Sequence, residues 1–463
     1  MKTCLRICTD DYDLIKNHLY PQDGKEAIAF ALCGRALAND RLVFTVYEIF
    51  NVPYSHCERE EDYLHWQTQD ILPLMNKAMN LHMAVLRIHS HPGGWPKFSH
   101  SDLTTDQEFF GSLMKGWCED GLPHLSAIML PCGNIVGRVY NADDTVQELD
   151  SVMVVGKNIQ IARYEAEKES ITLDEALRNI QAFGEGTINT FRKMRIGIVG
   201  CSGTGSHVIE QLMRLQVGEL VLVDPDRIES KNRNRLVAAG KDDIGKLKVE
   251  FYKNYIEGMQ LGVKVLAFPY DLYKNEEARR ALSTCDVIFG CVDSESARML
   301  INQISSFYLI PYIDIGVSLE ADGKGGVSYI GTQMDYLIPG KSSLMSRGSV
   351  RVENVAAELE KLFNPELYER HQREHYIRNV NVERPAVICI NGQIAYFAVL
   401  NLIDRLIGFR SEKPCGKYVF LLREDDVVKS EEEDFRIDDY LNKYRGRGDC
   451  KPYLNIPYFS EKV

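Results

Sequence analysis

Hydrophobic and polar positions in the first 155 residues follow the patterns of strands and helices in a mixed α/β region. Residues 83–91, MAVLRIHSH, alternate as a strand does, and 124–133 and 134–141 predict a further strand pair. The spacing in 101–117 predicts a helix. Residues 25–37, KEAIAFALCGRAL, predict another helix, followed by a β-rich run at 41–50.

The pattern changes after residue 155. Residues 157–195 are charged with helical spacing, and 194–215 predict a strand, a glycine-rich turn and a helix. Further strands are predicted at 218–226 and 285–293, so a doubly wound parallel sheet is expected. Residues 331–385 look polar and loop-like, and 385–409 predict a long apolar helix.

These patterns divide the chain into four segments. We expect an α/β domain at 1–155, a helical linker at 156–190, a doubly wound domain at 191–410, and an acidic extension at 411–463 that packs on the doubly wound domain.

Composition narrows the classes of protein that fit. The net charge of −12 argues against nucleic acid, and no apolar run reaches the roughly 18 residues of a membrane helix. The first twenty residues lack the apolar core of a signal peptide, and the 12 cysteines form no C-x-x-C pair. We therefore expect a cytoplasmic protein with reduced thiols and with protein or nucleotide partners.

Residues 87–102, RIHSHPGGWPKFSHSD, contain a candidate metal site. In a strand His89 and His91 point to the same face, and Asp102 can add a third ligand. Three protein ligands leave zinc a position for water, whose pKa the metal lowers toward about 7. Glu26, expected to open the helix at 25–37, is the candidate general base. Ser99 is either a donor to the oxyanion of the attacked carbonyl or, with Asp102, a helix-capping residue.

The combination of the upstream glutamate in KEAIAFALCG with H-x-H-P and S-x-x-D resembles the JAMM (MPN-plus, or JAB) metalloprotease motif over about residues 1–150. All five motif positions match. The resemblance implies a deaminase-like α/β fold and an active zinc enzyme that cleaves isopeptide or peptide bonds after the C-terminus of ubiquitin-like proteins.

The turn GCSGTG at 200–205 predicts a phosphate-binding loop at a helix N-terminus. Asp224 follows the next predicted strand and can bind ribose hydroxyls, which also fits an NAD dehydrogenase. Arg235 and Lys248 come close downstream and suit a triphosphate better than a dinucleotide. Asp293 ends another predicted strand and can hold magnesium.

These stretches, with the D-x-V-E-x-S-N-x-N-R-like run from Asp226 to Arg235, resemble the ThiF/MoeB/HesA group of the ubiquitin-activating enzyme superfamily over about 178–410. The resemblance implies a Rossmann-like fold that binds ATP and magnesium and adenylates a C-terminal carboxylate. By position it assigns the glycine loop, the nucleotide-binding residues, the phosphate lysine and the magnesium aspartate to Gly200, Gly203, Gly205, Asn232, Arg235, Lys248 and Asp293. It also implies a homodimer in which Arg178 enters the partner subunit's site.

One family feature is missing. Activating enzymes that pass ubiquitin onward use a crossover cysteine, but none lies between Cys291 and Cys389, and Cys389 is expected to be buried in the apolar helix. The domain therefore either stops at the adenylate or forms an oxyester on a crossover hydroxyl such as Ser343, which would need an adjacent base. Ser343 and Ser346 also replace one C-x-x-C pair of the family's zinc knuckle.

Together the two resemblances predict a bifunctional enzyme of a prokaryote-type ubiquitin-like modification pathway. The peptidase would trim or remove a small β-grasp protein, and the second site would adenylate the same terminus before a separate conjugating enzyme acts. Two alternatives remain: sulfur-carrier or peptide-modifying metabolism with a thiocarboxylate or amide product, and a non-enzymatic scaffold. Glu26 argues against the scaffold, because binding alone needs no general base.

Overall fold

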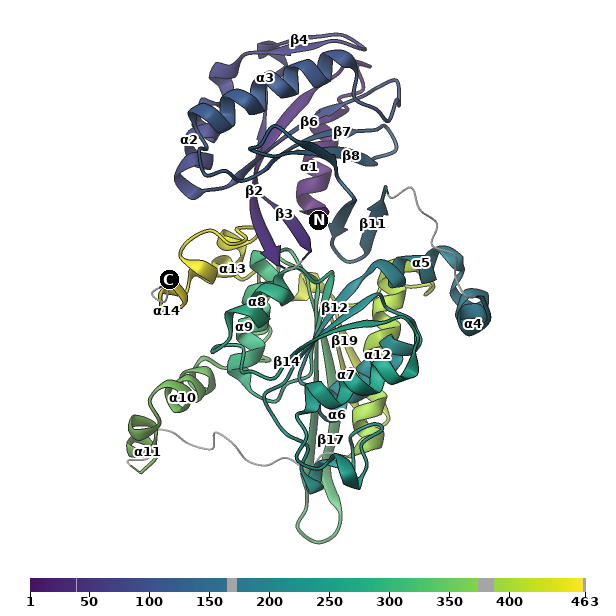
Figure 1. The fold of residues 1–463 in the computed structure, drawn as a ribbon. Coiled ribbons are helices and arrows are strands. Elements are labelled where there is room, and N and C mark those ends of the chain that lie inside the picture. The colour runs from purple at the N-terminus through teal and green to yellow at the C-terminus, as the bar shows by residue number, and fades with distance from the viewer. Residues whose placement is uncertain (39, 165–172, 374–386, 461–463) are drawn as a thin grey trace. The chain divides into compact units, whose positions relative to one another are not determined.

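The computed structural model describes residues 1–38, 40–164, 173–373 and 387–460, and its contacts divide the chain into two compact units. The first unit contains 1–168, 307–309 and 444–463, and the second contains 169–306 and 310–443. Each unit is built around its own large sheet (Figure 1). We describe the two units separately.

The first unit is a mixed α/β structure. Its helices and strands are β1 (Lys2–Cys8), α1 (Thr9–Leu19), β2 (Ile28–Ala38), β3 (Arg41–Asn51), β4 (Cys57–Arg59), β5 (Leu64–Trp66), α2 (Leu72–Leu81), β6 (Ala84–Ser90), α3 (His100–Gly116), β7 (His124–Met129), β8 (Ile135–Tyr140), β9 (Val146–Glu148), β10 (Ser151–Val155), β11 (Ile159–Arg163) and α14 (Pro457–Ser460).

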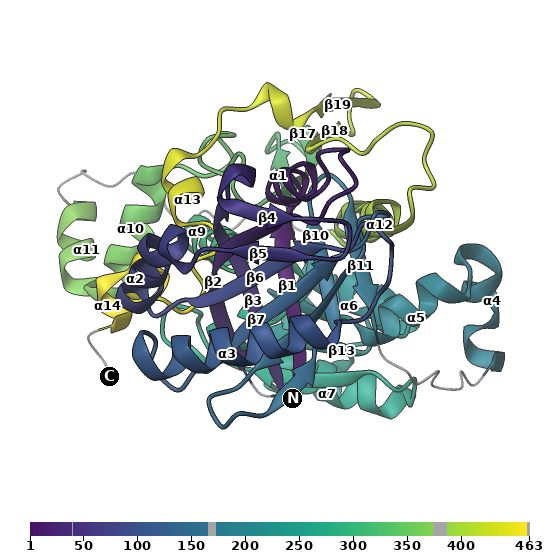
Figure 2. The same cartoon turned by 90° about the horizontal axis from the view of Figure 1, so that it is seen from above.

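Nine strands form the central sheet of this unit, in the order β11-β10-β1-β3-β2-β6-β7-β8-β9. Figure 2 shows α1 on one side of the sheet and α3 on the other. One buried cluster joins α1 to one face of the strands, and a second joins α2 and α3 to the opposite face. Both faces of the central strands are therefore dry.

This two-sided burial explains a wrong prediction. Residues 25–37 do not form a helix, because 28–38 are strand β2, which pairs with both β3 and β6. Alternate residues of β2 belong to the two different core clusters. A central strand with two covered faces has a continuous apolar run and not an alternating one, so its pattern is ambiguous with that of a helix. The expected linker at 156–190 likewise begins with a strand, β11, paired with β10.

The C-terminal segment 444–460 packs within the first unit, although we expected all of 411–463 to pack on the doubly wound domain. Arg445 forms two hydrogen bonds with Asp11 of α1, at 2.6 and 3.0 Å. The Thr45 hydroxyl donates to the carbonyl oxygen of Gly446 at 2.8 Å. Specific polar contacts, which local composition does not encode, decide where this segment packs.

The second unit alternates strands and helices. Its elements are α4 (Leu173–Phe183), α5 (Glu185–Lys193), β12 (Arg195–Val199), α6 (Gly203–Arg214), β13 (Glu219–Val223), α7 (Lys248–Met259), β14 (Lys264–Phe268), α8 (Glu276–Ser283), β15 (Val287–Gly290), α9 (Glu295–Phe307), β16 (Tyr312–Ala321), β17 (Val327–Leu337), α10 (Val352–Phe363), α11 (Pro365–Arg373), α12 (Ile388–Ile407), β18 (Lys417–Leu421), β19 (Asp426–Ser430) and α13 (Asp439–Tyr444).

Eight strands form its sheet in the order β14-β13-β12-β15-β16-β17-β18-β19. The first five are parallel, and β17 to β19 continue antiparallel. The strand order reverses between β12 and β15, which is the position where open α/β sheets bind ligands. The loop-like segment expected at 331–385 instead contains most of β17 and the helices α10 and α11.

The predicted apolar helix is α12, and it packs on α6 and on the sheet strands β16 and β17. Its burial accounts for its apolar composition. Within the described part of the chain, no helix combines the length and hydropathy that crossing a membrane requires.

Candidate functional site

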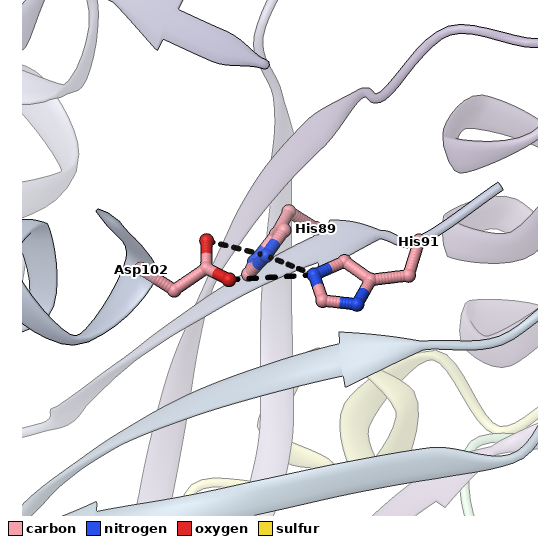
Figure 3. Close-up of side chains that lie close together, drawn as sticks. All are labelled: His89, His91 and Asp102. Atoms are coloured by element: carbon pink, nitrogen blue, oxygen red, sulfur yellow. Dashed lines mark hydrogen bonds and ion pairs between the residues drawn. The ribbon is translucent and has the colours of Figure 1, made fainter. Parts of the chain in front are cut away.

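The three predicted metal ligands of the first unit lie together (Figure 3). His89 is on β6 and His91 follows it by two positions, so both rings extend from the same face of the sheet. That face is covered by α3, whose first turn carries Asp102. The sequence prediction that these side chains converge is met in the structure.

The geometry of the cluster fits one cation. The two Nε2 atoms are 3.1 Å apart, and Asp102 lies 3.0 Å from Nε2 of His89 and 3.4 Å from Nε2 of His91. Tetrahedral zinc with bonds of 2.0–2.1 Å separates its ligand atoms by about 3.3 Å. Both imidazole rings are buried, and their Nε2 atoms face the same carboxylate, that of Asp102. Among the described residues, these three side chains form the one group of at least three histidines, cysteines or acidic residues whose ligand atoms all lie within 4.8 Å of one another.

The electrostatics act in opposite directions on the two histidines. Burial lowers the pKa of His91, but its hydrogen bonds to Asp102 and to the carbonyl of Trp95 outweigh burial and raise that pKa above its usual value. Burial lowers the pKa of His89, and the neighbouring Arg87 lowers it further, so the imidazole keeps a free lone pair. Burial opposes ionisation of Asp102, but hydrogen bonds from the two histidines outweigh it and hold the pKa of the carboxyl well below its usual range. An anionic carboxylate beside a neutral imidazole is a suitable donor pair for zinc.

Glu26 does not open a helix, against our prediction. The pairing of β2 with β6 brings it to this site. Strand β2 pairs antiparallel with β6, with Ile28 opposite His89, and the same register continued two residues places Glu26 opposite His91. The Glu26 carboxylate lies 4.0 Å from Nε2 of His91 and is 8% exposed. Burial raises the pKa of Glu26 to about 7, with Asp102 adding to the shift and His91 opposing it.

Ser99 caps α3. Its hydroxyl donates to the Asp102 carboxylate at 2.7 Å and accepts from the Asp102 N–H at 3.1 Å, while its own N–H donates to the same carboxylate at 2.8 Å. The capping interpretation thus has direct geometric support. With the hydroxyl proton directed at Asp102, the role as an oxyanion donor stays a prediction.

We did not predict a buried ion pair that lies next to the cluster of His89, His91 and Asp102. Arg87, two residues before His89, donates to Asp106 at 2.7 Å, and Tyr140 donates to the other oxygen of that carboxylate at 3.1 Å. Asp106 is one helical turn after Asp102, so both acids of α3 meet the same face of β6. Two features of the sequence could have indicated this ion pair. Arg87 is a charged residue within a buried strand, and Asp106 is four residues after the predicted ligand Asp102.

In the second unit, the three predicted glycines form a tight turn between β12 and α6. Gly200 has a φ of +90°, and a Cβ there would lie 2.5 Å from the carbonyl oxygen of Cys291. A Cβ on Gly205 would overlap the carbonyl of Gly200, and one on Gly203 would overlap the amide of Asn391 on α12. Each position therefore requires glycine, and the free N–H groups of the α6 N-terminus face the loop.

Asp224, Asp226 and Lys248 meet beside this turn. The buried Asp224 accepts from the N–H of Cys201 at 2.7 Å and from that of Asp226 at 2.9 Å. The Lys248 ammonium lies 2.8 Å from Asp226 and 3.5 Å from Asp224. Burial raises the pKa of Asp224 although Lys248 opposes the shift. Burial lowers the pKa of Lys248, but the two carboxylates outweigh it and raise that pKa above its usual value, so the lysine stays charged.

The other predicted nucleotide residues follow the strands β13 and β15. Asn232 is buried and accepts from the N–H of Glu229 at 3.0 Å. The side chain of Arg235 passes 3.3 Å from the position of a Cβ on Gly203. Asp293 is exposed in the loop after β15, the strand that pairs with β12. An exposed carboxylate at this edge suits Mg²⁺, which takes one or two carboxylates together with substrate phosphates.

The remaining predictions concern Arg178 and the missing thiol. Arg178 is on α4 and donates to Gln181 of the same helix at 3.0 Å. Cys389 is exposed, against our prediction of a buried thiol, because it lies in the first turn of α12. Ser343 is 1% exposed, and its hydroxyl donates to Asp438 at 2.6 Å. The base that an oxyester would need is thus present, but the hydroxyl is enclosed.

Comparisons with known proteins identify the second unit. Adenylyltransferase and sulfurtransferase UBA4 of Meyerozyma guilliermondii is 29% identical over 27% of this chain and 30% of its own length. Ubiquitin-like modifier-activating enzyme 5 of Aedes aegypti is 29% identical over 29% of this chain and 38% of its own. The chain thus spans about a third of the length of these curated relatives.

Among solved structures, E. coli MccB with MccA-N7isoASN aligns at a TM-score of 0.44 with 17% identity, covering 57% of this chain and 74% of MccB. Residues 174–434, more than half of the 463 residues, match the sequence profile of the ThiF family. The chain therefore belongs to the ThiF family.

Proposed function

We propose that this protein adenylates the C-terminal carboxylate of a small ubiquitin-like protein and that its N-terminal unit is a zinc-dependent peptidase acting on the same C-terminal tail. The observation that supports the proposal is that one chain contains two separate groups of residues suited to these two reactions. One gathers His89, His91, Asp102 and Glu26, and the other gathers a glycine turn, Lys248 and Asp293. Family membership and the printed names of the relatives support the adenylation half.

In the adenylation reaction, a carboxylate oxygen of the modifier attacks the α-phosphorus of ATP. The bond from that phosphorus to the bridging oxygen breaks, pyrophosphate leaves with the electron pair, and an acyl-adenylate remains. The barrier is mainly repulsion between anions, which Lys248 and Arg235 reduce together with the α6 N-terminus. Asp293 would hold the magnesium ion that accompanies the triphosphate.

Pyrophosphate exchange tests this half. With a pool of acetylated octapeptides that end in Gly-Gly with a free carboxylate, the protein should exchange labelled pyrophosphate into ATP. Asp293→Ala should abolish the exchange while the circular dichroism spectrum stays unchanged. Exchange that persists in this variant at the wild-type rate would remove Asp293 from the magnesium site.

A homodimer with Arg178 acting across subunits is part of this proposal and follows from the resemblance to the family. Subunit mixing tests it. Arg178→Ala and Lys248→Ala should each be inactive alone, and mixed dimers should regain exchange, because one of their two sites contains both cations. If mixing restores no activity, Arg178 does not act in trans.

In the peptidase half, His89, His91 and Asp102 would hold zinc, which supplies Lewis acidity and activates water when bound. Glu26 is placed to take a proton from that side of the cluster and to pass it to the leaving amine. Its raised pKa of about 7 suits both directions of transfer. The test uses a fluorogenic Gly-Gly-aminocoumarin peptide: Glu26→Ala should lose cleavage while the bound zinc, measured by mass spectrometry of metals, stays near one per chain. Cleavage that survives in this variant would remove the glutamate from the mechanism.

The sulfur-carrier alternative is supported by the relatives whose names include sulfurtransferase. It predicts a different product from the same adenylate. Mass spectrometry of the modifier after turnover with a sulfide donor separates the two: a mass gain of one sulfur-for-oxygen replacement indicates a thiocarboxylate. An alkali-labile ester on Ser343 would instead support the oxyester route.

A further inference from the structure

Helix α9 begins two residues after Asp293. Residues 291–294, the Asp293 loop, connect β15 to α9, and Asp293 is exposed within this loop. At one end of the loop, the carbonyl oxygen of Cys291 lies 2.5 Å from the position of a Cβ on Gly200 of the glycine turn. The other end joins the first turn of α9. The contacts of the α9 N-terminus therefore influence where Asp293 lies.

The first three N–H groups of α9, which the helix itself cannot satisfy, all have side-chain acceptors. Ser294 accepts from the N–H of Ala297 at 3.3 Å and so caps the helix. The other two N–H groups share one carboxylate, that of Glu358 on α10. It accepts from Glu295 at 3.2 Å and from Ser296 at 2.7 Å. The helix dipole favours an anion at this end, so Glu358 completes the first turn of α9.

The contact between α9 and α10 is reciprocal. The carboxylate of Glu295 accepts from the N–H of Arg351 at 2.5 Å and from the amide of Asn354 at 2.6 Å, both at the start of α10. Tyr273, whose hydroxyl donates to a carbonyl in the first turn of α9 at 3.1 Å, packs edge-on against Phe363 at the end of α10. Helix α10 lies beside α9 (Figure 1). Each helix thus supplies a carboxylate to the first turn of the other.

We infer that Glu358 is a positioning residue that holds the Asp293 loop in place for magnesium. This rests on the proposed adenylation function and adds a distant residue to its magnesium site. Mg²⁺ demands near-ideal octahedral geometry and is held by one or two protein carboxylates together with phosphates, so a displaced Asp293 has no substitute. Without Glu358, two N–H groups beside the loop lose their acceptor and the first turn of α9 is free to fray.

The test measures how strongly magnesium tightens the binding of a fluorescent ATP analogue. For each variant, the Kd in EDTA is divided by the Kd at saturating magnesium, and this ratio is the magnesium gain. A loss of folded protein changes both Kd values together, so a merely structural defect leaves the gain unchanged. The gain should be at least about tenfold in wild type, within the range usual for two coupled ligands. In Glu358→Ala it should fall below about threefold, with the Kd in EDTA within about twofold of wild type.

Three further variants complete the design. Glu353→Ala, the matched control, removes an exposed carboxylate from the first turn of the same helix and should keep the wild-type gain. Glu358→Gln keeps an oxygen that can accept one of the two hydrogen bonds, so it should keep more of the gain than Glu358→Ala. In an Asp293→Ala background, Glu358→Ala should change the gain no further, because the loop has lost the ligand that Glu358 positions.

The outcomes separate this inference from the proposal on which it rests. A wild-type gain in Glu358→Ala overturns the inference and leaves the magnesium role of Asp293 intact. Equal losses in Glu358→Gln and Glu358→Ala would mean that charge attracts the cation directly, which also overturns positioning. So would losses that add in the double variant. If magnesium does not tighten the analogue in wild type, or if Asp293→Ala keeps the gain, the proposed magnesium site fails and the inference fails with it.

Discussion

Replacing Asp102 by asparagine tests whether the cluster in the first unit binds zinc. Asparagine has nearly the same shape and can still accept the hydrogen bond from the Ser99 N–H, so the metal-free unit should keep its fold. What it loses is the negative charge that lies 3.0 and 3.4 Å from the two imidazole nitrogens. The variant therefore separates metal binding from helix capping.

The magnitude follows from linkage between metal binding and folding. Zinc at 100 times its Kd stabilises the native state by about 2.7 kcal/mol. Loss of a direct ligand should raise the Kd by at least about 100-fold, the upper end of what supporting residues of metal sites contribute. At the same zinc concentration the stabilisation of the variant then falls to about 0.4 kcal/mol. Zinc binding to cysteines of the unfolded chain cancels in this comparison, because both proteins have the same 12 cysteines.

The assay is urea unfolding followed by tryptophan fluorescence, with and without zinc. The three tryptophans, Trp66, Trp95 and Trp117, all belong to the first unit, so the signal reports on that unit alone. Ser99→Ala is the capping control and should lose about 1 kcal/mol in the absence of zinc. Glu26→Gln should keep the full zinc effect. The reasoning is refuted if zinc leaves the wild-type unfolding free energy unchanged, or if Asp102→Asn is stabilised as much as wild type.

Three further predictions concern other parts of the chain. Gly205→Ala should abolish binding of a fluorescent ATP analogue, because a Cβ there overlaps the carbonyl of Gly200. The control Gly258→Ala, at an exposed helical glycine with open space around it, should bind normally and gain up to about 1 kcal/mol in unfolding free energy. Equal affinities of the two variants would contradict the close-packed turn. Lys248→Met leaves the buried Asp224 without its cation and should cost about 3 kcal/mol by circular dichroism, with partial recovery in the double variant with Asp224→Asn. Burial lowers the pKa of His124 well below its usual value, so the neutral ring favours the folded state above about pH 6.5 and this contribution is lost as pH falls. From pH 6.5 to 5.5 tryptophan-monitored stability should drop about 1 kcal/mol more in wild type than in His124→Asn, and parallel pH profiles would refute this.

Local patterns in the sequence determined much of both sites. The period of two in a strand was enough to put His89 and His91 on one face, and the helix predicted at 101–117 begins within one residue of α3. The glycine turn and its flanking strand and helix were also correctly placed at 194–215, because a glycine-rich turn between an apolar strand and an amphipathic helix is a pattern of neighbouring residues. Such signals depend on a few neighbouring residues, and so they can be read without tertiary information.

Only the tertiary structure decided the features that depend on distant pairing. Strand β2 looked helical because its burial comes from α1 on one face and from α2 and α3 on the other. Glu26 reaches His91 through the register of β2 with β6, two strands that are far apart along the chain. The packing of 444–460 in the first unit was likewise decided by contacts between remote segments. The sequence gives the type of each side chain, but which residues neighbour it across a sheet depends on how the whole core packs. The free energy of burying that core outweighs the local preference of a segment for helix or strand.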